Sequence, residues 1–176
     1  MKKLIVILLC AVMALMLVAC GSKSVTDSQT DEQNLGEQSL GGAQIPNPFV
    51  DCKTLEEAQK LAGFDIALPD NMPEGYSKSA IRAVKDTMIE IIYTNGSDEI
   101  RIRKGTGSED ISGAYNEYNE TGTAAVGSLQ VTMKGSGGNV NVASWFNGDY
   151  AFSVTINLGG AGLDESVVSD MVSGVK

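Results

Sequence analysis

The chain has 176 residues with 13 basic and 22 acidic side chains, which gives a formal net charge of −9. A surface this acidic repels nucleic acid and anionic lipid headgroups, so we expect neither as a ligand. Histidine is absent, which removes the commonest general base, the usual zinc ligand and the usual partner of a catalytic serine.

The first residues have the pattern of a secretory signal. Two lysines precede an uncharged apolar run over residues 4–19, and small residues stand before a cleavage point. The sequence Leu17-Val18-Ala19-Cys20 resembles a bacterial lipobox, which implies cleavage before Cys20 and attachment of diacylglyceryl and palmitoyl lipid to that cysteine. We therefore predict a signal peptide over residues 1–19 and an extracytoplasmic protein that contacts the cell membrane through the Cys20 lipid.

An uncleaved transmembrane anchor is the alternative for this run. A spanning helix needs about 20 apolar residues, with a lower limit of about 17. Residues 4–19 lie near that limit, and Lys23 alone stands where a stop-transfer cluster would be expected. The cysteine at the cleavage point favours the lipobox. Removing the first 19 residues leaves 157, and the loss of two lysines lowers the formal charge from −9 to −11.

Residues 20–45 are predicted to form a flexible tether. This stretch is rich in Ser, Gln, Asp, Glu and Gly, and it has too few large apolar residues to form a core. A flexible chain of this length reaches roughly 25–30 Å. The remaining residues, 46–176, have the size of one domain.

Cysteine usage predicts a domain without an internal disulfide. With Cys20 lipidated, Cys52 is the only other cysteine of the mature chain. A lone thiol in an exported protein can be free or pair with another chain, but packing as a small apolar residue is favoured. No activating base is evident for a cysteine nucleophile. We expect a domain that needs neither metal nor cofactor.

A short helix is predicted near the start of the domain. Thr54 followed by Glu57 is typical of a capping box. The apolar residues of 55–62 form one stripe, and Gly63 is a natural stop. The paired acids Glu56 and Glu57 are better explained by the helix cap and dipole than by acid–base chemistry.

Strands are predicted over residues 64–68 and 76–84, followed by a hairpin of 88–93 with 99–104. Asn95-Gly96 fits a two-residue type I′ turn. This turn places Ile91 opposite Ile100. The charged Glu99, Arg101 and Arg103 then fall on the other face of the sheet.

Residues 105–120 are predicted to be a loop. Its glycines lack the lysine of a P-loop. The sequence Ser108-Glu109-Asp110 lacks the ordered spacing of a calcium loop. Two tyrosines, Tyr115 and Tyr118, follow in the same stretch.

From Thr123 the sequence is typical of a meander of hairpins. Gly127-Ser128 fits a type II′ turn that pairs Val126 with Leu129. A four-residue loop over 135–138 would pair Met133 with Val140.

The last hairpin has two possible registers. A two-residue loop at Asn147-Gly148 would pair Trp145 with Tyr150, and a three-residue loop over 147–149 would pair Phe146 with Tyr150. The second is preferred because it gathers the valines and most aromatic residues on one face. It leaves Trp145 on the opposite face, where a helix or the loop of 115–118 must cover it.

The chain ends in a predicted helix. Leu163, Val167, Met171 and Val175 recur at four-residue spacing, and Asp164 is a plausible cap. The economical architecture is an α+β fold, in which a single antiparallel, meander-rich sheet packs with an N-terminal and a C-terminal helix.

Several short motifs follow one another in a fixed order across residues 46–176. They are Asn47-Pro48-Phe49, Leu55-Glu56-Glu57-Ala58, Ala62-Gly63-Phe64, Leu68-Pro69, Pro73-Glu74-Gly75-Tyr76, Ile91-Ile92-Tyr93, Ile111-Ser112-Gly113, Tyr118, and the group of Trp145, Gly148 and Tyr150. Together they resemble the bacterial domain of unknown function 4367 family. The resemblance implies an exported or lipid-anchored domain. The family has no established catalytic residues, so none is transferred.

Three functions follow as hypotheses. The first is a non-enzymatic binding module with an unknown protein or small-molecule partner, for which Trp145, Tyr150, Tyr115 and Tyr118 are candidate contacts. The second is a carrier or sensor that holds a small or lipidic ligand on the second face of the sheet, where Ile92 and Trp145 are expected. The third is a hydrolase that uses two carboxylates about 5–10 Å apart, although no motif positions such a pair.

Overall fold

The structure is a computed structural model that describes residues 46–157 and 160–176. The predicted signal peptide, Cys20 and the tether lie outside the described residues. One compact unit spans Ile45–Lys176.

The described residues contain nine strands and a helix near each end of the domain. The elements are β1 (Val50–Cys52), α2 (Leu55–Ala62), β2 (Ser77–Val84), β3 (Met88–Asn95), β4 (Asp98–Thr106), β5 (Glu120–Val126), β6 (Leu129–Ser136), β7 (Asn139–Asn147), β8 (Tyr150–Ile156), β9 (Leu163–Asp164) and α3 (Glu165–Gly174).

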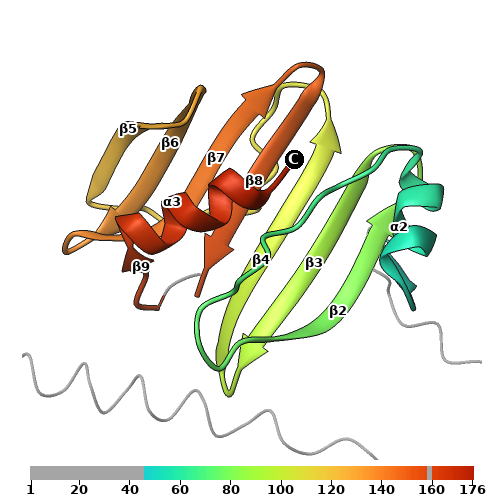
Figure 1. The fold of residues 1–176 in the computed structure, drawn as a ribbon, viewed down its shortest axis with the longest axis horizontal. Helices are drawn as coiled ribbons and strands as arrows, with labels where there is room; N and C mark the ends of the chain where they lie inside the picture. The colour runs from blue at the N-terminus through green and yellow to red at the C-terminus, as the bar shows by residue number, and fades with distance from the viewer. Residues whose placement is uncertain (1–45, 158–159) are drawn as a thin grey trace, which may run out of the picture. The chain divides into compact units, whose positions relative to one another are not determined.

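One antiparallel sheet contains all the strands, in the order β1-β2-β3-β4-β8-β7-β6-β5, and β9 pairs with β7 (Figure 1). Two meanders, β1–β4 and β5–β8, are joined where β4 pairs with β8. The predicted α+β fold with one meander-rich sheet and two helices is confirmed.

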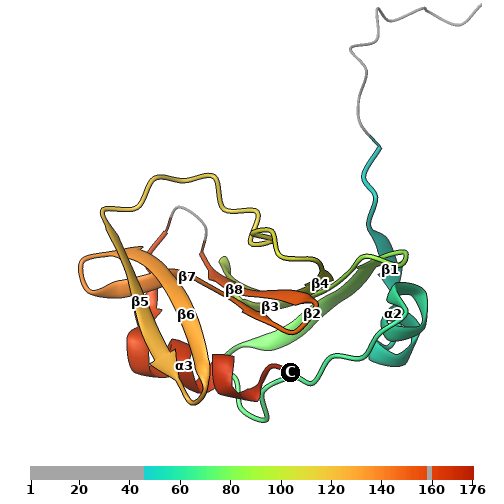
Figure 2. The same cartoon turned by 90° about the horizontal axis from the view of Figure 1, so that it is seen from above.

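This strand order forces residues 107–119 to cross the sheet, and we call them the crossing segment. β4 ends in the middle of the sheet, whereas β5 lies at its edge, beyond β8, β7 and β6. At about 4.8 Å per strand, the crossing segment must cover roughly 19 Å. Figure 2 shows it running over the face opposite α3. We call the face under α3 the core face and the other the second face.

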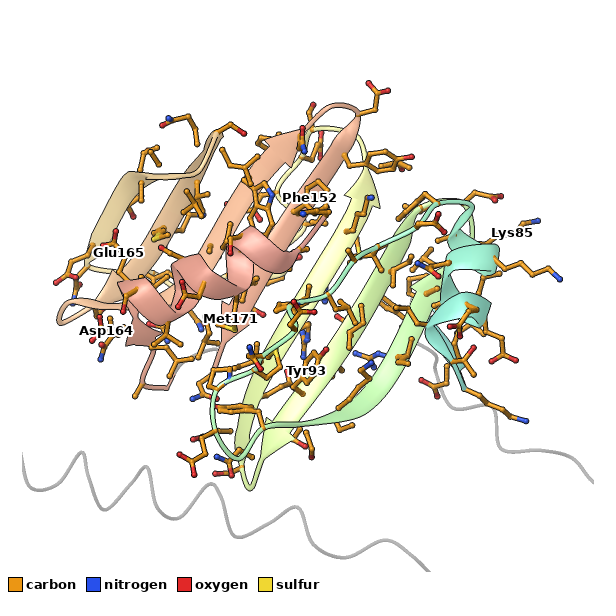
Figure 3. The ribbon with its side chains drawn as sticks, viewed as in Figure 1. Lys85, Tyr93, Phe152, Asp164, Glu165 and Met171 are labelled. Carbon is orange, nitrogen blue, oxygen red and sulfur yellow. The ribbon has the colours of Figure 1, made fainter. Side chains whose placement is uncertain are left out.

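The core face carries the apolar side chains of the sheet. Figure 3 shows Phe152 on β8 and Met171 on α3, where the helix lies against the strands. The largest fully buried side chains of this core are Trp145, Ile89, Ile91, Ile100, Ile102, Ile156, Met171, Val131, Val154 and Val168. Burying a side chain of this size stabilises the fold by about 1.5–3 kcal/mol.

Helix α2 forms as the capping pattern predicts. The Glu57 amide donates to Thr54 Oγ1 at 3.2 Å, and the Glu57 carboxylate accepts from the Lys53 amide at 2.7 Å. Gly63 ends the helix with φ of 81°, a conformation that glycine adopts without strain.

The predicted strand over 64–68 is wrong. No described strand lies between α2 and β2. Ile66 is buried in the core, while Ala67 exchanges two backbone hydrogen bonds with Lys176 at the end of the chain. The apolar pattern here reflects packing onto the core face, and the segment does not join the sheet.

The hairpin β3–β4 has the predicted faces but a different turn. Its loop is Gly96-Ser97, and Ile91 lies opposite Ile102. Gly96 supplies the positive φ, 60°, while Asn95 stays in the strand. The shift from the predicted register leaves every side chain on its expected face, because it corresponds to two residues.

The turn at Gly127-Ser128 is confirmed by the pairing of Val126 with Leu129. The loop expected over 135–138 is wrong, because Gly137-Gly138 alone forms the turn and Gly135 pairs with Val140. A β-carbon on Gly135 would lie 1.8 Å from the Asn139 carbonyl oxygen, so this position requires glycine. A bulge next to Gly135 then moves Met133 opposite Ala143.

Both registers considered for β7–β8 are wrong. The loop is Gly148-Asp149, and Trp145 lies opposite Phe152. Trp145 is therefore on the core face, and the expectation that it lies on the second face is wrong. Phe146 takes the outward position and is 50% exposed. The turn residues fit all three loops, so cross-strand stacking of Trp145 on Phe152 decides the register.

The C-terminal helix is confirmed over Glu165–Gly174, with Val168, Met171 and Val172 buried. Leu163 is not helical, because it pairs with Val140 in β9. Asp164 occupies the cap position, but its side chain makes no capping hydrogen bond.

Candidate functional site

The four predicted aromatic contacts do not come together. Trp145 is buried and Tyr150 half-buried on the core face, where Tyr150 lies 5.0 Å from Phe64 between ring centroids. Tyr115 and Tyr118 lie on the crossing segment, over the second face. Tyr115 is 97% exposed, while the hydroxyl of Tyr118 is buried and has no hydrogen-bond partner among the described residues.

Tyr150 is part of a packed environment around Lys104. The ammonium of Lys104 lies 4.5 Å from the Tyr150 ring centroid, 5.3 Å from that of Phe152 and 5.7 Å from that of Phe64. It donates to the Asp65 carbonyl oxygen at 2.6 Å. Burial lowers the pKa of Lys104, and the Asp65 carboxylate opposes that shift. These cation–π contacts explain how the core face accommodates a charged residue.

The second face carries a charged cluster on β2, β3 and β4, formed by Arg82, Glu90, Arg101 and Arg103. Strand pairing assembles it, because Glu90 lies directly opposite Arg82 on β2 and Arg103 on β4. Side chains alternate along a strand, so Arg101 falls on the same face as Arg103. We call these four residues the arginine cluster.

The carboxylate of Glu90 is completely buried and contacts all three guanidinium groups. Arg82 Nε donates to Glu90 Oε1 at 2.8 Å, and Arg103 Nε donates to Glu90 Oε2 at 2.7 Å. Arg101 Nε lies 3.3 Å from Glu90 Oε2 without hydrogen-bond alignment. Arg101 also donates to Glu99 Oε1 at 2.5 Å. A buried carboxylate is tolerated only with partners of this kind.

Charge in this cluster is not balanced. Three guanidinium groups face the carboxylates of Glu90 and Glu99, so one positive charge is in excess. The side chains of Arg82, Arg101 and Arg103 are only 26%, 20% and 12% exposed. The arginine cluster thus has a local excess of positive charge in a chain whose formal net charge is −9.

Two segments cover the arginine cluster. Arg103 donates through Nη1 to the Ile111 carbonyl oxygen at 2.7 Å, which fastens the crossing segment to the sheet. The Phe49 ring centroid lies 5.2 Å from Arg82 Cζ and 5.7 Å from that of Arg103. Phe49 and the crossing segment therefore cover much of the arginine cluster.

Asp110 adds a further attachment of the crossing segment. Its carboxylate lies 3.3 Å from Lys134 Nζ and accepts from the Ser112 amide at 2.8 Å. Burial acts to raise the pKa of Asp110, but the hydrogen bonds from Ser112 and Lys134 outweigh burial and lower that pKa. Asp110 thus serves the loop, and no calcium site is needed to explain it.

The arrangement can bind charge but lacks the groups for acid–base catalysis. Guanidinium groups stay protonated at all ordinary pH values and donate hydrogen bonds. Ser153 Oγ, buried on the same face opposite Arg103, has no hydrogen-bond partner among the described residues. Unpaired donors beside an excess positive charge suit an anion.

Glu90 and Arg82 were not predicted as site residues, although Arg101 and Arg103 were expected on this face of the sheet. The available signal was one carboxylate in the otherwise apolar stretch Met88–Tyr93, next to a strand with alternating arginines. A lone acid in a buried strand indicates a basic partner on the neighbouring strand.

Cys52 is half-buried on β1. Burial raises the pKa of its thiol, and the nearby Glu57 and Asp51 raise it further. Such a thiol is a poor nucleophile. Within residues 46–157 and 160–176, no group of three or more Cys, Asp or Glu side chains is placed to hold a metal ion. No helix in the same part of the chain is long and apolar enough to cross a membrane.

Comparison with family models, curated proteins and solved structures found no match to this chain. The resemblance to the domain of unknown function 4367 family therefore stays a prediction that rests on the motifs alone.

Proposed function

We propose that this protein is a lipid-anchored extracytoplasmic module that acts by binding and not by catalysis. The proposed location rests on the lipobox-like Leu17-Val18-Ala19-Cys20 and on the polar stretch that follows it. The binding role rests chiefly on one observation: Glu90, the one fully buried acid of the described residues, is engaged by three arginines. A carboxylate held in this way is not free to act as a general acid or base.

The same observation weighs against a two-carboxylate hydrolase, because that chemistry needs a second acid with a different environment across a cleft. A lipidic ligand on the second face also loses support, because Trp145 belongs to the core face and Ile92 is 7% exposed. The support that remains is for a surface that recognises a partner.

Replacing Cys20 tests the proposed lipid anchor. We expect a Cys20→Ala variant, expressed in a bacterial host, to lose incorporation of labelled palmitate and to keep its signal peptide, because the lipid must be added before cleavage. A Cys52→Ser variant is the matched control and should incorporate label like the parent. Equal labelling of the parent and Cys20→Ala would contradict the proposal.

A carrier or sensor of a small anion is the second proposal. It is favoured by the excess positive charge of the arginine cluster and by the unpaired Ser153 Oγ beside it. The crossing segment would have to open to admit the ligand, because the cluster is covered.

Citrate serves as the probe of this second proposal. We expect citrate to raise the melting temperature of the full chain above that in sodium chloride of equal ionic strength, because it binds the folded state. Arg101→Gln should remove this difference, while Lys85→Gln, at an exposed turn, should keep it. Identical melting temperatures in both salts would exclude binding of carboxylate anions at the arginine cluster.

A further inference from the structure

The two edges of the sheet differ in length. At one edge β1 has only three residues, whereas at the other β5 has seven, from Glu120 to Val126. β6 is the one strand that pairs with β5, and residues 46–157 and 160–176 make no other backbone hydrogen bond to it. The outer edge of β5 thus presents unpaired backbone groups.

The hairpin geometry shows which backbone groups point outward. In a two-residue hairpin the residues that flank the turn exchange both hydrogen bonds, so Val126 is bonded to Leu129. Alternation then directs the backbone groups of Ala124 and Gly122 toward β6. The N–H and C=O groups of Thr121, Thr123 and Ala125 point away from the sheet.

β5 has none of the usual features that prevent an edge strand from pairing. Such edges normally carry lysine, proline, a bulge or a charge that points inward. β5 contains no Lys or Pro, and its register with β6 is uninterrupted. Its single charge, Glu120, accepts hydrogen bonds from the amides of Gly137 at 3.1 Å and Gly138 at 3.0 Å. This carboxylate is thereby satisfied within its own sheet.

We infer that β5 pairs antiparallel with β5 of a second copy, about a two-fold axis at Thr123. The three outward-facing residues are symmetric about this axis: Thr123 lies opposite Thr123, and Thr121 opposite Ala125. No like charges meet, because Glu120 lies opposite Val126. A self-complementary patch is what a two-fold interface requires. This inference names the partner of the binding module and so rests on the function proposed above.

A groove beside β5 supports the same pairing. It has a volume of about 440 Å³ and is lined by Gly122, Ala124, Met133, Gly135 and Glu165, among others. Figure 3 shows Glu165 at the start of α3 on the core face. In the two-fold pairing, Val126 of the second copy stands opposite Glu120, at the border of this groove. Its lining mixes apolar side chains with polar ones such as Asn119 and Asn139, and it leaves space beside the edge at which the second strand would be added.

Cross-linking of the full chain tests the pairing. In a Cys52→Ser background, we expect Thr123→Cys to form a disulfide between two copies, because directly opposed residues lie about 5.5 Å apart between Cα atoms. Thr132→Cys is the matched control, since Thr132 lies opposite Thr123 on β6. Its two copies would be about three strand spacings, roughly 14 Å, apart and beyond disulfide reach.

The expected result is a cross-linked dimer with Thr123→Cys, at least about tenfold more abundant than with Thr132→Cys, because only the first geometry allows the bond. Similar yields at the two positions, or none at Thr123, would overturn the proposal. The Cys52→Ser chain without an added cysteine shows whether Cys20 itself cross-links.

A proline variant provides an independent readout. Thr123→Pro removes one outward-facing N–H and no hydrogen bond to β6, so the melting temperature should change little. Native mass spectrometry of the detergent-extracted full chain should count two copies in the parent and one in the variant. If the variant does not fold, Thr123→Lys replaces it and should also give one copy, because like charges would meet on the axis.

A monomeric parent would show that β5 does not pair with itself, whether its edge is free or taken by residues 20–45 or another protein. Failure of the pairing is distinguishable from failure of the lipid anchor. Cys20→Ala removes only the lipid and should still give two copies by native mass spectrometry.

Discussion

Trp145→Ala should lower the free energy of unfolding by about 3–5 kcal/mol, the usual range for deleting a buried large aromatic side chain. Trp145 is 2% exposed and stacks on Phe152, with ring centroids 5.3 Å apart and planes inclined by 7°. It lies in β7, between β8 and β6, on the core face. Its removal leaves a cavity that the surrounding strands cannot close. Chemical denaturation of the variant measures the loss.

Phe146 gives a matched control within the same strand. It is adjacent to Trp145 but 50% exposed, so Phe146→Ala should cost about 1 kcal/mol or less. Fluorescence of the native protein provides a second check, because iodide should quench the buried tryptophan poorly. Full stability of Trp145→Ala, together with free quenching, would contradict the packing and would make Trp145 a candidate contact for a partner.

Glu90→Gln should be nearly as damaging, with an expected loss of about 3–5 kcal/mol, the range for removing one member of a buried charge group. The variant keeps the shape and hydrogen-bonding capacity of the side chain but leaves three half-buried arginines without their shared counter-charge. Urea denaturation measures this effect. Glu90 positions the Arg103 side chain, which donates a hydrogen bond to the Ile111 carbonyl oxygen. Glu90→Gln should therefore also loosen the crossing segment, and amide exchange over residues 107–119 should become faster.

Glu99→Gln is the control for charge alone. Glu99 pairs with Arg101, one of the same arginines, but its side chain is 38% exposed. An exposed ion pair contributes about 0–1 kcal/mol, so the control should lose little stability. Equal denaturation midpoints for Glu90→Gln and Glu99→Gln would mean that removing the buried charge of Glu90 destabilises the protein no more than removing an exposed one. That result would contradict a structural role for the arginine cluster.

Local signals in the sequence predicted the fold well where they act over a few residues. The capping pair Thr54 and Glu57 defined α2, and the alternation of 88–104 gave the correct faces of β3 and β4. The Gly127-Ser128 turn fixed the register of β5 with β6. In each case the contacts that decide the structure lie within one helix or one hairpin.

Registers and site residues that depend on distant contacts could not be read in this way. The face of Trp145 was predicted wrongly because the turn residues after it are compatible with three loop positions. Packing against Phe152 selects one of them. The bulge beside Gly135 depends on the close approach of Asn139. The arginine cluster requires β2, β3 and β4 to be aligned, and its cover requires the β4–β8 pairing that sends residues 107–119 across the sheet.

The mass of the N-terminal peptide of the mature protein tests the central proposal, a lipid-anchored module, most directly. The protein would be extracted from membranes of a bacterial host, digested and analysed by mass spectrometry. We expect a first peptide that begins at Cys20 and carries the mass of a diacylglyceryl group with its fatty acids. A peptide that begins elsewhere, or an unmodified Cys20, would contradict the lipid anchor and with it the proposed location.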